Sequence, residues 1–168
     1  MKQLIRLVLL VVLVVGWGMG PAQAQDTAPA PKGILIIPAI GLVRFIQTAP
    51  VVEVGGLRVH DVSWLGDGVA WLEGTGWVEH PRWRMALAGH NPGAFSRLGE
   101  LLPGDPIYLV TGAGLVRYVA AEFYVVDPAE TWVLDSTGEP SLVLITCSGT
   151  QRLAVVAWRA AAGRGELP

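Results

Sequence analysis

The sequence has 168 residues, of which 52% are hydrophobic and 15% are charged, and its formal net charge at pH 7 is −2. This length suits one domain with a short leader, and the composition favours a filled hydrophobic core and excludes a disordered chain. The slightly acidic charge lacks the basic footprint that nucleic-acid binding needs, so we expect no nucleic-acid partner.

The first 24 residues have the features of an export signal. Lys2 and Arg6 precede an uncharged, mostly apolar stretch over residues 7–20, and Ala22 and Ala24 frame a candidate cleavage site. Residues 7–25 are 19 uncharged residues in a row, close to the roughly 20 that cross a bilayer. A cleaved signal peptide and a retained signal anchor both fit. Either one delivers the remainder of the chain to the outer face of the membrane or the cell envelope.

Beyond the leader, residues 25–32 are expected to form a Pro/Ala linker, residues 33–162 one folded domain, and residues 163–168 a flexible tail. The domain contains short runs rich in Val, Ile and Leu and bounded by Gly, Pro, Asp or Ser, which are typical of β-strands. These runs lie at residues 34–40, 49–54, 84–90, 106–110, 114–126, 141–147 and 152–160.

The pattern as a whole predicts an all-β domain. Many short strands without long helices between them indicate a sandwich or a closed barrel, and strands that are apolar on both faces favour the barrel. Only residues 93–102 have helical periodicity, with Phe95, Leu98 and Leu101 on one face over about two turns. Residues 110–118 predict a hairpin that turns at 112–114.

The single cysteine, Cys147, ends one of the predicted strands, and Arg152 begins the next. If residues 148–151 form a hairpin loop, Cys147 and Arg152 close it from opposite strands and share a face of the sheet. An isolated thiol is mostly protonated at neutral pH, and a fixed positive charge favours the thiolate anion. The spacing therefore predicts an arginine beside the sulfur, where it also suits a developing oxyanion.

A nucleophilic cysteine needs a group that moves protons, and the chain has three histidines. His90 ends the apolar run at 84–90, so it occupies the same kind of position as Cys147. His60 and His80 lie in polar segments that suggest solvated loop residues. The residues alone therefore favour His90 as the proton-transfer partner.

Three segments of the chain resemble the sortase family. The segment "LAGHNPGAFSRLGELLPGDPIYLV" looks like the family's catalytic-histidine segment, and "LVLITCSGTQRLAVVA" is similar to its Thr-Cys strand, variable loop and Arg strand. The segment "IIPAIGLVRFIQTAPVVEV" resembles the opening of such domains. Together they occur in family order over most of residues 33–160.

The resemblance implies an eight-stranded sortase-like β-barrel with one or two short helical turns. It also implies that His90, Cys147 and Arg152 form the catalytic triad and that Thr146, before the cysteine, contacts substrate. The implied reaction is transpeptidation: Cys147 cleaves an LPxTG-like sorting motif in a substrate protein and passes the acyl group to an amine of the cell envelope or another protein. This chemistry needs no metal and no cofactor.

The chain departs from the family pattern before the histidine strand, where many members have Gly-Asn and residues 82–84 read "RWR". Other cysteine classes fit less well. L,D-transpeptidases place an arginine almost directly after a Ser-x-Gly-Cys motif, and papain-like enzymes place the cysteine before the histidine. A catalytically silent barrel that serves as an exported binding or scaffold domain is the alternative from a different functional class.

Overall fold

The computed structural model describes residues 30–79 and 83–161. The predicted leader, the tail at 163–168 and His80 lie outside these residues. Within them, ten β-strands and three single turns of 3₁₀ helix follow in this order: β1 Gly33–Ile37, η1 Pro38–Ile40, β2 Leu42–Ala49, β3 Val51–Val54, β4 Leu57–His60, β5 Val69–Leu72, β6 Met85–Gly89, η2 Leu98–Glu100, β7 Pro106–Thr111, β8 Gly114–Val126, η3 Trp132–Leu134, β9 Ser141–Ser148 and β10 Gln151–Arg159.

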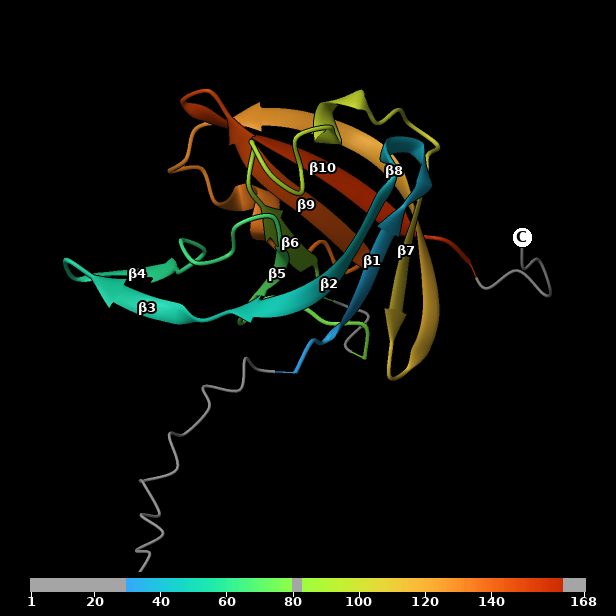
Figure 1. Ribbon diagram of the computed structural model, residues 1–168, viewed down its shortest axis with the longest axis horizontal. Coiled ribbons are helices and arrows are strands. Elements are labelled where there is room, and N and C mark those ends of the chain that lie inside the picture. The colour runs from blue at the N-terminus through green and yellow to red at the C-terminus, as the bar shows by residue number, and fades with distance from the viewer. Residues whose placement is uncertain (1–29, 80–82, 162–168) are drawn as a thin grey trace, which may run out of the picture.

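Eight of these strands close into a barrel in the order β1-β2-β5-β6-β9-β10-β8-β7 (Figure 1). The all-β, eight-stranded barrel expected from the sequence is therefore confirmed. Strands β3 and β4 form a separate two-stranded hairpin that projects from the barrel wall. Where a helix was expected at 93–102, the chain makes a series of turns that end in η2.

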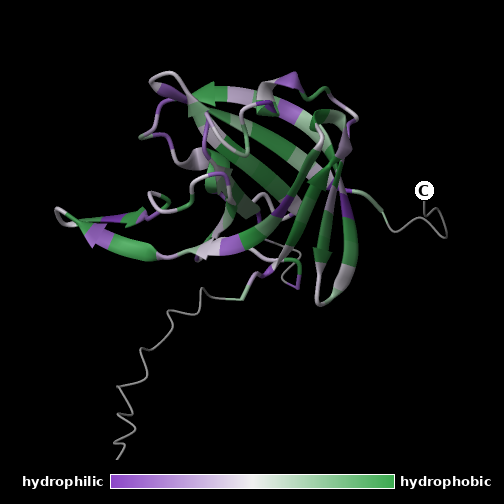
Figure 2. Ribbon diagram, in the orientation of Figure 1, coloured by the Kyte–Doolittle hydropathy of each residue, from purple (hydrophilic) through white to green (hydrophobic). Residues whose placement is uncertain are grey.

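The barrel is filled by one hydrophobic cluster, and a second cluster covers part of its outer face. Along β6, Met85 and Leu87 belong to the inner cluster, whereas Ala86 belongs to the outer one. This alternation follows from the two-residue period of a strand. Figure 2 shows β9 and β10 hydrophobic along most of their length, because both of their faces are covered there.

Short segments pack over the outer cluster and bury it. Val133 in η3 and Leu65 in the loop between β4 and β5 are both buried against this cluster. The barrel wall formed by β5, β6 and β9 therefore carries a second apolar layer, and the candidate site lies at the edge of that layer.

The predicted linker makes contact with the barrel at its last residue. The Lys32 amide donates to Ile46 O at 2.8 Å, and its ammonium group lies 4.2 Å from the centroid of the Trp71 ring. The predicted hairpin at 110–118 is also present, with Thr111 paired to Gly114 across a two-residue turn. No helix in the described part of the chain is long and apolar enough to span a membrane.

Candidate active site

The site is built on two neighbouring parallel strands, β6 and β9. Their register pairs Met85 with Leu142 and Ala88 with Ile145. Cys147 lies two residues after Ile145 on β9, so its side chain is on the face of Ile145, which is the outer face of the barrel. His90 directly follows β6, and its ring bonds to the carbonyl of Val62, a residue packed against the same outer cluster.

Two hydrogen bonds join the ends of these strands. The buried hydroxyl of Thr146 donates to Gly89 O at 2.8 Å, and the Asn91 side-chain amide donates to Cys147 O at 3.2 Å. Thr146 is only 3% exposed. Its hydroxyl therefore holds together the segments that carry Cys147 and His90, while contact between Thr146 and substrate remains a prediction.

Close packing below His90 explains the glycine before it. A Cβ atom on Gly89 would lie 2.8 Å from Cδ2 of Phe95, a ring that is fully buried. The Phe95 amide donates to His90 O at 3.1 Å, so the chain turns back on itself directly after the histidine. The short "GHNPGAF" segment thus holds His90 against the barrel.

The hairpin between β9 and β10 brings Arg152 to Cys147. The two residues are paired across the strands, as the spacing predicted. The turn is shorter than the expected loop, because Ser148 pairs with Gln151 and leaves only Gly149 and Thr150 between them. Gly149 has a φ of 61°, a left-handed conformation that glycine adopts without a Cβ clash.

The arginine contacts the sulfur directly. Nη1 of Arg152 lies 3.7 Å from Sγ of Cys147, within hydrogen-bond range for sulfur. Cys147 is half-buried and unpaired, and Arg152 is solvent-exposed. The guanidinium can therefore stabilise negative charge on the sulfur, and its remaining N–H groups are available to a bound oxygen atom.

His90 is oriented by a main-chain carbonyl. Its Nε2 lies 2.8 Å from the oxygen of Val62, in the loop between β4 and β5. A carbonyl oxygen can only accept, so Nε2 carries the hydrogen and Nδ1 is the nitrogen that remains for proton exchange. The ring is half-buried, so its orientation is restricted, but part of it is still accessible to solvent.

The expectation that His60 is a solvated loop residue is wrong. His60 ends β4, is half-buried, and places Nε2 2.8 Å from Glu73 O. The reason is that residues 57–60 pair with β3, where Val51 faces His60. Such a short, mixed segment carries little strand signal in the sequence.

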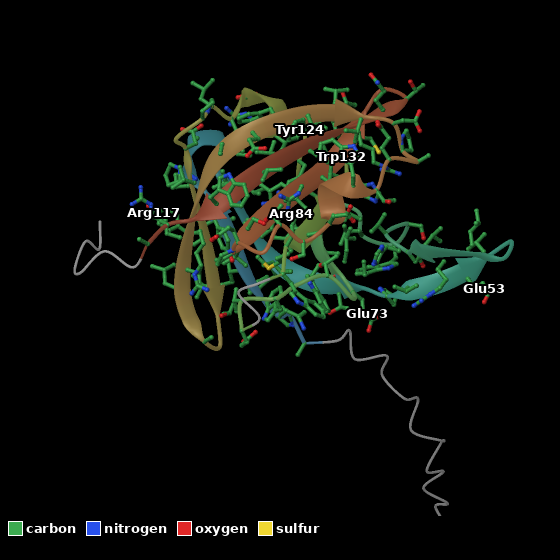
Figure 3. All side chains as sticks on the ribbon, turned by 180° about the vertical axis from the view of Figure 1, so that it is seen from behind. Glu53, Glu73, Arg84, Arg117, Tyr124 and Trp132 are labelled. Atoms are coloured by element: carbon green, nitrogen blue, oxygen red, sulfur yellow. The ribbon has the colours of Figure 1, made fainter. Side chains whose placement is uncertain are left out.

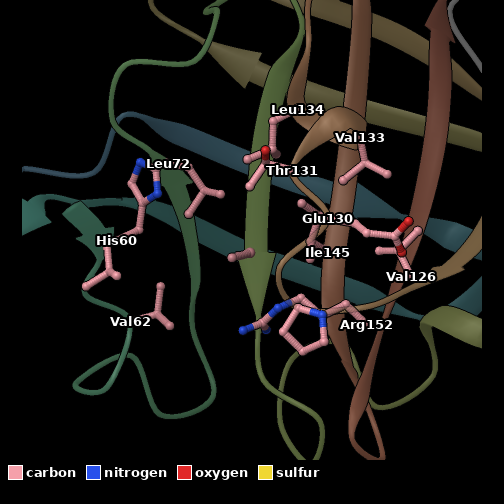
Figure 4. Close-up of a pocket in the computed structure, with 13 residues that line it drawn as sticks. His60, Val62, Leu72, Val126, Glu130, Thr131, Val133, Leu134, Ile145 and Arg152 are labelled. Carbon is pink, nitrogen blue, oxygen red and sulfur yellow. The ribbon is translucent and has the colours of Figure 1, made fainter. Parts of the chain in front are cut away.

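An apolar pocket of about 270 Å³ lies on this outer face. Figure 4 shows His60 and Val62 on one side of it and Glu130, Thr131 and Val133 on the other. Ala88 of β6 and Ile145 of β9 also line it, each two residues before His90 or Cys147. Arg152 lines the same pocket, so one side chain contacts both the sulfur and the cavity.

Sequence reasoning missed several parts of this site. The Val62 carbonyl has no sequence motif because it is a main-chain atom. The pocket wall formed by η3 has none because it belongs to a loop. Asn91 adjoins His90 in the sequence, but its contact with Cys147 depends on the pairing of β6 with β9. Among the described residues, no cluster of His, Cys, Asp and Glu could hold a metal ion.

The sequence model of the sortase domain matches residues 35–160. This chain belongs to the sortase family, whose members are transpeptidases. No protein with a curated description is significantly similar to it in sequence.

Solved structures of sortases share its fold. Sortase C-1 from Actinomyces oris is 26% identical, with a TM-score of 0.65 over 77% of this chain and 73% of that one. A Clostridium perfringens sortase D5 transpeptidase is 22% identical, with a TM-score of 0.67 over 78% and 79% of the two chains. Sortase C from Clostridium perfringens SM101 is 25% identical, with a TM-score of 0.67 over 80% and 72%. Together with the family match, these likenesses identify the barrel as the sortase fold.

Proposed function

We propose that this chain is a cysteine transpeptidase that cleaves an LPxTG-like sorting motif through an acyl-enzyme on Cys147. The observation that carries the proposal is the contact of 3.7 Å between Arg152 Nη1 and Cys147 Sγ beside an apolar pocket. The pocket walls, with Val62, Leu72 and Val133, suit the leucine and proline of such a motif.

In the first half-reaction, Cys147 Sγ attacks the threonine carbonyl of the motif. The carbonyl oxygen becomes an oxyanion, which the Arg152 guanidinium stabilises. Collapse of this intermediate breaks the peptide bond after the threonine and leaves a thioester. The protonated His90 gives the Nδ1 proton to the leaving amine, since Nε2 is held by Val62 O.

In the second half-reaction, an amine from the cell envelope or another protein attacks the thioester. Neutral His90 accepts a proton at Nδ1, an amide bond forms, and the thiolate of Cys147 leaves. His90 gives up a proton in the first half-reaction and regains one in the second, so the catalytic groups return to their starting state. The proposed chemistry calls for no metal or cofactor. The substrate is a protein that carries the sorting motif near its C-terminus.

We also propose that the chain acts outside the cytoplasm, at the membrane or in the cell envelope. The support is the sequence of residues 1–24, with its positive start and apolar stretch. Recovery of the chain from membranes with Met1 intact would show a retained anchor. A mature chain that starts at Gln25 would show a cleaved signal peptide.

Intact-mass analysis tests the proposed chemistry. The full chain is mixed with a panel of LPxTG-like peptides, beside Cys147→Ala and the control Ser148→Ala, which alters the exposed neighbour. We expect a peptide adduct on the parent chain and on Ser148→Ala that an added amine discharges, and none on Cys147→Ala. A folded chain that forms no adduct and does not react with a thiol probe would contradict the proposal and favour the silent barrel.

A further inference from the structure

Arg84 is a buried cation outside the reacting groups. It directly precedes β6, at the position where the chain departs from the family's Gly-Asn pattern, and it is only 5% exposed. Burial lowers the pKa of its guanidinium, while the negative charges of Glu122 and Asp135 oppose that change. A buried charge is costly to keep unless its hydrogen bonds are satisfied, so its partners are informative.

The guanidinium connects two separate segments. Nη1 donates to Val133 O at 2.9 Å, and Nε donates to the Ser141 hydroxyl at 3.2 Å. Val133 is the middle residue of η3, and Ser141 is the buried first residue of β9. Arg84 therefore ties the loop between β8 and β9 to the beginnings of β6 and β9, the two strands that lead to His90 and Cys147.

That loop forms one wall of the pocket. Val133 and Leu134 of η3 both line the cavity, as do Val59 and Val62. Within the turn itself, the amides of Leu134 and Asp135 donate to the carbonyls of Thr131 and Trp132. Such short-range bonds shape the turn and do not determine its distance from the barrel.

A second contact lies on the same side of the loop. The rings of Tyr124 and Trp132 meet edge to face, with centroids 5.0 Å apart. Figure 3 shows Arg84, Tyr124 and Trp132 gathered around the same outer part of the barrel. Two aromatic rings can shift relative to each other and stay in contact, so this pair fixes the position of the loop only loosely. The hydrogen bonds from a guanidinium to two acceptors depend on direction and fix that position more strictly.

We propose that Arg84 is a positioning residue for substrate: it holds η3 at the distance from the barrel that the peptide groove requires. This inference rests on the proposed function of the pocket and adds a determinant of substrate binding. Arg84 contacts neither Cys147 nor the pocket, so its loss should weaken peptide binding and leave the reactivity of the sulfur unchanged.

The test compares Arg84→Met and Arg84→Lys in the full chain. Methionine keeps an unbranched apolar side chain and removes the charge and donors, whereas lysine keeps the charge but cannot reproduce the planar fork. Arg117→Met is the matched control, because it makes the same change at an exposed position on β8. The readouts are amide hydrogen exchange, the rate of Cys147 labelling by a small thiol probe, and KM and kcat for a sorting peptide.

For Arg84→Met we expect amides at 131–136 to exchange about tenfold faster, with barrel amides unchanged. We expect KM to rise about tenfold, with kcat and the probe-labelling rate unchanged, because binding common to ground and transition states is lost. Arg84→Lys should lie between the parent and Arg84→Met, and Arg117→Met should match the parent. If Arg84→Met does not fold, Ser141→Ala takes its place, with an expected rise in KM of about threefold.

Two results would overturn the inference: unchanged exchange at 131–136, or loss of protection spread evenly over the barrel. The first would show that η3 holds its place without Arg84, and the second would show a general role in stability. If the folded parent chain processes no sorting peptide and its Cys147 does not react with the thiol probe, the proposed function fails, while the exchange data still decide whether Arg84 positions the loop.

Discussion

Nη1 of Arg152 lies 3.7 Å from Sγ of Cys147, across a hairpin whose turn contains only Gly149 and Thr150. So short a turn leaves little freedom between the two side chains. Solvent exposure of the guanidinium weakens its electric field. In the proposed mechanism, its direct contact with the sulfur still places it close to the substrate oxygen on which negative charge would develop.

Substitution of Arg152 should therefore slow the chemistry. We expect Arg152→Met to lower kcat about 10²- to 10³-fold, the usual cost of losing one oxyanion donor. For Arg152→Lys we expect a smaller fall in kcat, because lysine keeps the positive charge but lacks the planar guanidinium with its paired donors. Single-turnover acylation by a sorting peptide measures the effect. Equal acylation rates in the parent and Arg152→Met would exclude a role for the guanidinium in the transition state.

His90 and His60 should give different kinetic signatures. For His90→Gln we expect kcat to fall about 10²- to 10⁴-fold, because the leaving amine loses its proton donor. His60 lines the pocket and bonds to Glu73 O, so His60→Gln should mainly raise KM, by about threefold. Steady-state kinetics on the two variants decide this. A large fall in kcat for His60→Gln would mean that the wrong histidine has been assigned.

Thr146 should contribute to stability and to the alignment of the site. Thr146→Val keeps the shape but leaves Gly89 O without its donor, which should cost about 1–3 kcal/mol of unfolding free energy. Thr150→Val, in the exposed turn, is the control and should change stability by less than about 0.5 kcal/mol. Chemical denaturation measures both, and equal stabilities would show that the buried hydroxyl adds nothing.

The turn at Asp61 precedes Val62, whose carbonyl bonds to His90. We expect the stability of this turn to decrease at acidic pH. The pKa of Asp61 is lowered because its carboxylate accepts hydrogen bonds from the hydroxyl and amide of Ser63. The ionised form is thus favoured in the fold. Its stabilising effect is present above the unfolded pKa of about 3.9 and is lost as the pH falls through the lower folded value.

We therefore expect Asp61→Ala to be less stable than the parent at pH 7, and the difference to shrink below about pH 4. Thermal unfolding across this range measures it, with Glu53→Ala on the exposed hairpin as the control. Because Asp61 adjoins Val62, whose carbonyl holds His90, kcat at pH 7 should fall about threefold. A stability difference that stays constant from pH 7 to pH 3 would contradict this account.

Much of the fold was predictable because its signals are local. Continuous apolar runs marked β7, β8, β9 and β10, and the pairing of Cys147 with Arg152 followed from the length of one hairpin. Strand β2 was not among the predicted runs, because Arg44 and Gln47 interrupt its apolar residues. Strands β4 and β5 were missed too, since each has four residues and lies among glycines and polar residues. A strand that short takes its conformation from its partners more than from its own sequence.

Residue types and their spacing were enough to predict the reacting groups: one cysteine, an arginine five residues later, and a histidine at the end of an apolar run. How these groups are held relative to one another depends on contacts between segments that are far apart in the chain. Parallel pairing of β6 with β9 joins segments 57 residues apart, as the bond from Thr146 to Gly89 shows. The Val62 carbonyl selects the histidine nitrogen, and Arg84 reaches η3 through the packed outer layer. These contacts depend on backbone atoms and long-range register, and neither is encoded by the spacing of residues along the chain.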